Sequence, residues 1–330
     1  MQSRTSIWLY AATGVVLASA TLCRAAEGAE GLHVGLQLEC ASYAIGEPVF
    51  VLVTLTNRGD KVIKTRLPKR ELQGFSLEMA FEDGEFRKID FRMFLPGHTP
   101  FPVREFKPKE SIAGSEPILL KPGSQGLVQK EPEKWARALI CDQPGKCRIR
   151  ASVSVPLSDE EGLSVVSEPV EFTVTAAKDG ARRFVELAAA NFGSGVLQLS
   201  ADGYKRAKEA YPDLKGTVYG RYVQWSMMKY YALHSMSDRE GADLLPEEKQ
   251  QREEYRRFAE SVLSGDRKIW TGYAEAALAF LVEYHVRSGD FEHAMKYAKV
   301  LAEKTPWSRF ADVASKLQEH LEKSRAKAKQ

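Results

Sequence analysis

The feature that most constrains the fold of this chain is a change in its hydrophobic period near residue 177. Over residues 31–176, apolar and polar residues alternate, as in the run from Val34 to Cys40. A period of two indicates half-buried β-strands. Over residues 178–328, apolar residues recur at helical spacing, which indicates amphipathic helices. We therefore predict a multidomain β + α protein, with a β domain over 31–176 followed by an all-α domain over 178–328.

Turn signals divide the first half into strands. The turn sequence Gly46-Glu47-Pro48 precedes Val49–Thr56, which is apolar on both faces. We expect this strand to be central in its sheet and covered on both sides. The dipeptide Asp83-Gly84 follows the alternating run Phe75–Phe81 and predicts a hairpin, with a return strand over 89–93.

The later strands of this half are predicted over Cys147–Val155 and over Val165–Val174. In all, about seven short strands fit two antiparallel sheets packed face to face. The residues in Tyr43–Asn57 and in Pro144–Arg150 resemble bacterial immunoglobulin-like and fibronectin-type modules. They also look like the β-sandwich of a bacterial intracellular proteinase inhibitor family. This resemblance implies an antiparallel immunoglobulin-like β-sandwich.

A Pro-rich stretch from Leu95 to about Ile118 is predicted to be a long connection between strands. Connections of that length in compact domains are often functional. Its His98, Phe101 and Phe106 are therefore candidate contacts for a binding partner. The alternative is an ordered crossover between the two sheets with no binding role.

The second half predicts several helices. Aromatic and apolar residues from Tyr219 to Leu233 share one helical face, which we assign to the core. Pro246 opens another helix, a further one covers Tyr273–Tyr284, and the next ends before Pro306. A last helix is predicted around 310–321.

The segment Glu275–Ser308 resembles one tetratricopeptide repeat. Leu281, Gly289, Ala294 and Pro306 have the spacing that this family uses. The resemblance implies a helical-hairpin, tetratricopeptide-like domain with a protein-binding groove. Ordinary helical packing explains the same residues.

The first 26 residues are typical of a secretory signal peptide. Arg4 supplies a positive start, Ile7–Leu22 is apolar, and the small residues Ala25 and Ala26 follow. The apolar stretch is shorter than the ~20 residues that span a bilayer. We expect it to be cleaved, leaving an exported protein without an integral membrane span in the periplasm, at the cell surface or secreted. An uncleaved anchor and lipid attachment at Cys23 are the alternatives.

Three cysteines, Cys40, Cys141 and Cys147, lie beyond the signal peptide, so at most one intramolecular disulfide forms. Cys141 and Cys147 flank a turn sequence and are placed to pair across a hairpin. Cys40 is the rival partner of Cys147, because both fall on predicted inward faces. No Cys-x-x-Cys spacing indicates a metal or redox site.

The composition and motifs argue against several functions. The net charge of +3 is spread over both halves, so neither presents the basic face that a nucleic acid needs. A glycan or anionic surface stays open as a ligand through the basic stretch Lys61–Arg70. No zinc-protease or serine-hydrolase motif occurs, and we predict no catalytic residue, cofactor or metal. Glu283, His285 and His293 lie close on the helical pattern without zinc-motif spacing, and the two histidines are assigned as candidate partner contacts.

These features together predict an exported, non-enzymatic protein-interaction or scaffold protein with a protein partner. One alternative is an inhibitor of an extracellular hydrolase that acts through the loops of the β-sandwich. The other is a hydrolase or glycan-active protein whose site lies at the junction of the two domains.

Overall fold

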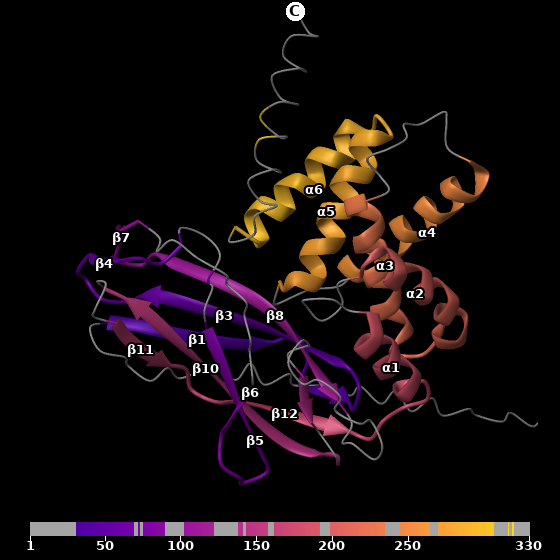
Figure 1. Ribbon diagram of the computed structural model, residues 1–330. Coiled ribbons are helices and arrows are strands. Elements are labelled where there is room, and N and C mark those ends of the chain that lie inside the picture. The colour runs from indigo at the N-terminus through magenta and orange to yellow at the C-terminus, as the bar shows by residue number, and fades with distance from the viewer. Residues whose placement is uncertain are drawn as a thin grey trace, which may run out of the picture.

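The computed structural model describes the chain from residue 31 to residue 306 with gaps. The described ranges are 31–68, 72, 75–89, 102–121, 138–140, 143–157, 162–191, 199–234, 245–264 and 270–306, together with 316 and 319. Strands make up the first part and helices the second, which confirms the β plus α class (Figure 1). Within the described residues, no helix is both long and apolar enough to cross a membrane.

The first sheet has the strand order β1-β3-β8-β9. Its pairs are antiparallel except for the parallel pair of β8 and β9. Its strands are β1 (Leu32–Leu38), β3 (Pro48–Asn57), β8 (Ser111–Lys121) and β9 (Ala138–Ile140).

The second sheet has the order β2-β12-β10-β5-β6, and β11 pairs with β10 outside this path. Its strands are β2 (Ser42–Ala44), β5 (Phe75–Phe81), β6 (Arg87–Ile89), β10 (Gly145–Pro156), β11 (Gly162–Val166) and β12 (Val170–Thr175). A short ladder joins β4 (Ile63–Thr65) to β7 (Arg104–Phe106).

The core of the strand part lies between the two large sheets. Alternate residues of β3 and β10, such as Val53 and Val153, are fully buried in one apolar cluster. The prediction that Val49–Thr56 is central and covered on both sides is confirmed. β3 lies between β1 and β8, and its other face carries Phe50 into the apolar cluster of the helices.

Two strand predictions need correction. The stretch up to Ile118 is not a connection throughout, because β8 begins at Ser111 and pairs with β3 over most of its length. Its Pro117 is accommodated because β9 pairs with β8 only from Leu119 on, so β8 is still an edge at Pro117. The predicted last strand is two strands, β11 and β12, interrupted at Ser167–Pro169. The hairpin at Asp83-Gly84 is confirmed by the antiparallel pairing of β5 with β6.

The described helices lie on one side of the sheets (Figure 1). They are α1 (Ala181–Asn191), α2 (Ala201–Leu214), α3 (Gly220–His234), α4 (Pro246–Leu263), α5 (Gly272–Arg287) and α6 (Phe291–Lys304). The last four agree with the predicted helices except for the one around 310–321, which lies outside the described residues. α1 and α2 were not predicted individually.

The aromatic stripe of α3 is buried, as predicted. Tyr219, Tyr222 and Trp225 are each at most 4% exposed and belong to the helical core. Local signals fix the helix ends. Pro246 starts α4, and Glu248 at the third position accepts a hydrogen bond from the backbone N–H of Leu245.

Candidate functional site

The strand part and the helical part meet at the turn between β2 and β3. Gly46 in this turn has φ +93°, a conformation that L side chains rarely adopt. A Cβ there would also lie 3.2 Å from the ring of Tyr219. The turn therefore needs glycine for its backbone and for the close approach of α3. We call this contact region, Ile45–Phe50 with the helices it touches, the junction.

Aromatic stacking fills the junction. The Phe50 ring lies 5.2 Å from Tyr273 of α5, 5.8 Å from Trp225 of α3 and 6.4 Å from Tyr222 of α3, between centroids. Phe50 itself is only 2% exposed. Side chains far apart in the sequence thus share one apolar cluster, which ties β3 to two helices.

A buried carboxylate completes the junction. Glu47 is 5% exposed, and its Oε1 accepts hydrogen bonds from Arg221 Nη2 at 3.0 Å and from the Tyr222 hydroxyl at 3.1 Å. Its Oε2 accepts from the backbone N–H of Ala44. The Tyr219 hydroxyl donates to the carbonyl of Ile45 at 2.6 Å. Because these contacts engage both oxygens of Glu47, the carboxylate holds the parts together, and it gives no support to a hydrolase site at the junction.

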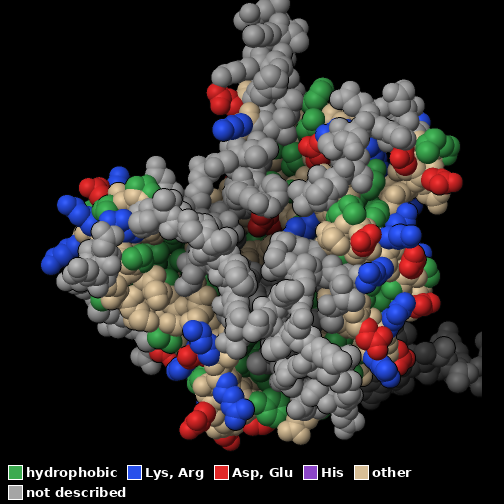
Figure 2. Space-filling view, in the orientation of Figure 1, with side chains coloured by type: hydrophobic (Ala, Val, Ile, Leu, Met, Phe, Trp, Pro, Cys, Tyr) green, Lys and Arg blue, Asp and Glu red, His purple; other side chains and the backbone are tan. Residues whose placement is uncertain are grey.

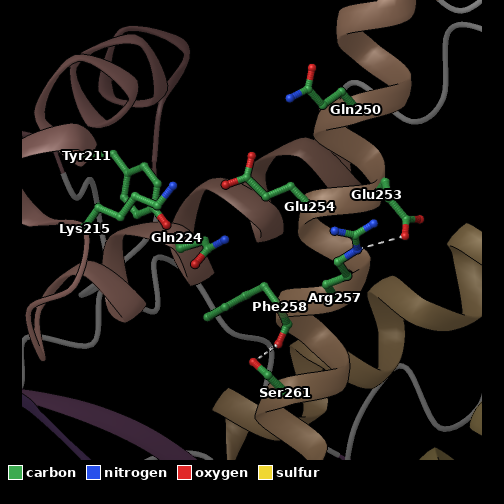
Figure 3. A pocket seen from close by; sticks show the side chains of 9 residues that line it. All are labelled: Tyr211, Lys215, Gln224, Gln250, Glu253, Glu254, Arg257, Phe258 and Ser261. Atoms are coloured by element: carbon green, nitrogen blue, oxygen red, sulfur yellow. Dashed lines mark hydrogen bonds and ion pairs between the residues drawn. The ribbon is translucent and has the colours of Figure 1, made fainter.

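The helical part contains a cavity of about 560 Å³ between α2, α3 and α4 (Figure 3). We call it the groove. Glu254 and Phe258 extend from α4 toward the Tyr211 and Gln224 side (Figure 3). Tyr211, Gln224, Glu253 and Phe258 are half-buried lining residues, and Lys215, Gln250, Glu254, Arg257 and Ser261 are exposed ones.

A tyrosine network ties α2, α3 and α4 together. Tyr204 of α2 and Tyr255 of α4 bring their hydroxyl oxygens within 3.2 Å, and Gln251 Nε2 donates to both. The Tyr204 ring also stacks on Tyr230 of α3 at 4.7 Å. These contacts connect the three helices that line the groove, so its shape is set before any ligand arrives.

The groove carries both signs of charge. Lys215 and Arg257 contribute positive charge, while Glu253 and Glu254 contribute negative charge. Lys, Arg, Asp and Glu side chains are likewise interspersed over the helices on the face in Figure 2. Such a surface is not the basic face that a nucleic acid needs.

Glu253 is the most strongly perturbed acid of the groove. A hydrogen bond from Arg256 is the main cause that lowers its pKa to about 2. Further hydrogen bonds from Arg257 and from the Tyr284 hydroxyl act in the same direction. The charged form of Glu253 is thus fixed by two arginines on its own helix and a tyrosine of α5.

Replacing Glu253 by glutamine is expected to destabilise the protein at neutral pH and to have little effect near pH 2. The folded pKa of about 2 lies below the ordinary value of 4.5. The charged carboxylate therefore contributes stability that is fully present above pH 4.5 and is lost as the pH falls through 2. Urea midpoints of both proteins across this range measure the difference. Glu254→Gln, at the neighbouring exposed carboxylate, is the control and should change stability little at neutral pH; an equal loss in both variants would contradict the assignment.

The residues predicted as partner contacts do not form one site. Phe106 in β7 is 0% exposed, so its prediction as a contact is wrong. The ladder with β4 turns it into the core, and Asn57 Nδ2 donates to its carbonyl at 3.0 Å. His98 and Phe101 lie outside the described residues.

His285 and His293 are brought together by the turn between α5 and α6. Their Nδ1 atoms lie 3.2 Å and 2.8 Å from the same oxygen of Asp290, Oδ2. Their rings stack with centroids 5.1 Å apart. His285 is 7% exposed, so it is not the surface residue that we predicted. Glu283 takes no part in this cluster and pairs instead with Arg287.

The cysteine predictions are only partly covered by the described residues. Cys147 is 0% exposed in β10, as its predicted inward position requires. Cys40 follows the end of β1 and is exposed, so its predicted inward position is wrong. Cys141 lies outside the described residues, so its pairing with Cys147 stays a prediction.

Sequence patterns had little chance of finding the groove. Its residues come from three helices, and α2 was not predicted individually. Phe258 was grouped with the core of α4 on helical spacing, yet it is half-buried and lines the groove. Spacing shows which residues share a face but not that three faces leave a gap.

Comparison with known proteins assigns no family. No protein-family model matches the sequence, and no curated protein matches it. A β-glucosidase from Erythrobacter marinus is 16% identical over 44% of this chain and 15% of its own, with a TM-score of 0.23. The C-terminal domain of wzt is 8% identical over 46% and 77%, with a TM-score of 0.28.

An Escherichia coli alpha-2-macroglobulin structure, spanning domain MG7 to the C-terminus, is 13% identical over 83% of this chain and 42% of its own, with a TM-score of 0.25. The chain spans less than two thirds of the length of this structure and of the β-glucosidase. With TM-scores this low, none of the three likenesses assigns a fold family or an activity to this chain.

Proposed function

We propose that this is an exported, non-enzymatic protein that binds a protein partner through the groove between α2, α3 and α4. The observation that carries the proposal is the lining of the groove. Two half-buried aromatic residues, Tyr211 and Phe258, lie among amides and charges of both signs. Aromatic residues and arginine are the side chains that most often dominate protein–protein binding.

The size and rigidity of the groove also favour a binding role. A volume of about 560 Å³ holds a few side chains of a partner. The hydrogen bonds among Tyr204, Gln251 and Tyr255 set the spacing of α2 and α4 in advance. Preorganisation of this kind lowers the entropy cost of binding.

We also propose finer fold assignments. The strand part is an immunoglobulin-like β-sandwich, supported by two facing sheets around one core. The helical part is tetratricopeptide-like, supported by the hairpin of α5 and α6, in which the small residues Ala294 and Ala298 are fully buried. In such repeats small residues let paired helices approach closely, and the concave surface is used for binding. Export rests on the signal-peptide pattern of the first 26 residues.

Reversing the positive charges of the groove is expected to abolish partner binding. The variant Lys215→Glu with Arg257→Glu changes two exposed lining residues, so the fold should be retained. The whole chain without its first 26 residues serves as bait for the extracytoplasmic proteins of its source. Quantitative mass spectrometry then compares wild type with the variant, and we expect at least about a tenfold loss of the partner, or ~1.4 kcal/mol.

The matched control is Lys205→Glu with Lys249→Glu. It makes the same charge change on the same two helices at exposed positions that do not line the groove. This control should capture the partner as well as wild type does. Failure of the intact chain to retain any protein, or equal retention by both variants, would reject the groove as the binding site.

A further inference from the structure

We propose that His285, Asp290 and His293 form a binding site for a divalent transition-metal ion, with Zn²⁺ as the best-suited ion. One potential ligand atom from each residue lies within 4.8 Å of the other two. The site is at the turn between α5 and α6 and is separate from the groove. It does not depend on the proposed partner binding.

The distances suit a metal ion. Nδ1 of His285 and Nδ1 of His293 lie 3.2 Å and 2.8 Å from Asp290 Oδ2. Ligand atoms around tetrahedral zinc lie about 3.3 Å apart, because each is about 2.0–2.2 Å from the ion. The three groups thus reach metal-binding separations with only small side-chain shifts.

The fold holds each ligand in place. Asp290 is the N-cap of α6, where Oδ1 accepts a hydrogen bond from the backbone N–H of His293 at 3.3 Å. This contact leaves Oδ2 directed at the two imidazoles. The His285 ring is packed between Tyr297, stacked at 5.6 Å, and Tyr284, edge-on at 5.2 Å. Ligands that are oriented in advance by their neighbours bind metal more tightly.

The protonation state of the cluster also favours a cation. Burial is the main cause that lowers the pKa of His285, so its ring is neutral at neutral pH, as metal ligation requires. The Nε2 atom of His285 is buried and has no hydrogen-bond partner among the described residues. This ring is therefore not committed to a second structural hydrogen bond.

The ligand set selects the class of ion. Two imidazole nitrogens and one carboxylate oxygen suit Zn²⁺ and its transition-metal neighbours, whereas Ca²⁺ and Mg²⁺ prefer oxygen ligands alone. His293 and Asp290 keep side-chain exposures of 54% and 39%. An ion at this position is thus reachable from solution, and water fills its remaining coordination positions.

Isothermal titration of the tag-free chain with ZnCl₂ near neutral pH tests the site. We expect one equivalent of Zn²⁺ to bind, with Mg²⁺ and Ca²⁺ giving no binding at the same concentrations. Asp290→Asn keeps a good N-cap but replaces the carboxylate ligand. His293→Gln removes an exposed imidazole with little effect on packing. Each variant should weaken Zn²⁺ binding by at least about tenfold, since even outer contacts of metal ligands are worth 10–100-fold.

The matched control is Asp202→Asn, which removes an exposed carboxylate from the first turn of α2 and should leave Zn²⁺ affinity unchanged. Circular dichroism confirms that each variant is folded. If Asp290→Asn does not fold, His293→Gln alone decides. Absence of saturable Zn²⁺ binding, or wild-type affinity in the folded ligand variants, overturns the proposal, because the ion would then be held elsewhere, for example by cysteine.

Discussion

Phe50→Ala is expected to lower the free energy of unfolding by about 3–5 kcal/mol, the cost of truncating a buried Phe in a packed core. The Phe50 side chain is 2% exposed and contacts Tyr222, Trp225 and Tyr273 of two helices. The substitution therefore leaves a cavity between the strands and the helices. Urea denaturation followed by tryptophan fluorescence measures the loss, because Trp225 lies directly against the removed ring.

The control for this prediction is Phe291→Ala. It removes the same side chain from the first turn of α6, where Phe291 is 46% exposed. Its cost should stay within about 1 kcal/mol, because little apolar surface returns to water. Phe50→Leu, which keeps most of the volume, should cost less than Phe50→Ala. If Phe50→Ala is no more harmful than Phe291→Ala, the packing of β3 on the helices is not present in solution.

Glu47→Ala is expected to cost about 2–4 kcal/mol, because it leaves buried donors without an acceptor. The backbone N–H of Ala44 loses the Glu47 carboxylate in a place where Ala44 is 1% exposed. The Tyr222 hydroxyl loses the same acceptor. The Arg221 side chain is 49% exposed and stays hydrated, so the loss falls below the 3–5 kcal/mol found when fully buried pairs are broken.

Glu78→Ala provides the comparison for Glu47. Glu78 of β5 also pairs with an arginine, Arg150, at 2.6 Å, but its side chain is 28% exposed and that of Arg150 is 37% exposed. Its removal should cost about 0–1 kcal/mol, as for other surface ion pairs. A double-mutant cycle of Glu47→Ala with Arg221→Ala isolates their coupling. Equal losses for Glu47→Ala and Glu78→Ala would show that the buried position of Glu47 adds nothing.

Local patterns predicted much of the fold because they record which faces are covered. The alternation in Phe75–Phe81 and the dipeptide Asp83-Gly84 gave the hairpin of β5 and β6. The helical spacing after Tyr219 gave α3, and Pro246 gave the start of α4. Each of these signals acts within a few turns or one strand pair, where sequence neighbours are also neighbours in space.

Other predictions failed because their outcome depends on distant segments. Phe106 lies in a Pro-rich stretch that is typical of a surface connection, yet the ladder of β7 with β4 buries it completely. Ser111–Ile118 belonged to the same predicted connection, yet pairing with β3 makes it part of a long strand. Non-local backbone pairing of this kind leaves only a weak trace in local composition.

The sequence by itself determined the order of strands and helices, and it required that β3 be covered on both faces. It did not determine what covers the second face. Only the tertiary structure brought the helices to Phe50, buried Glu47 of an ordinary-looking turn against Arg221, and placed Asp290 between His285 and His293. The physical reason is separation along the chain: Glu47 and Arg221 are 174 residues apart. Burial patterns state that a side chain leaves water, but its partner is chosen by the packing of the whole chain.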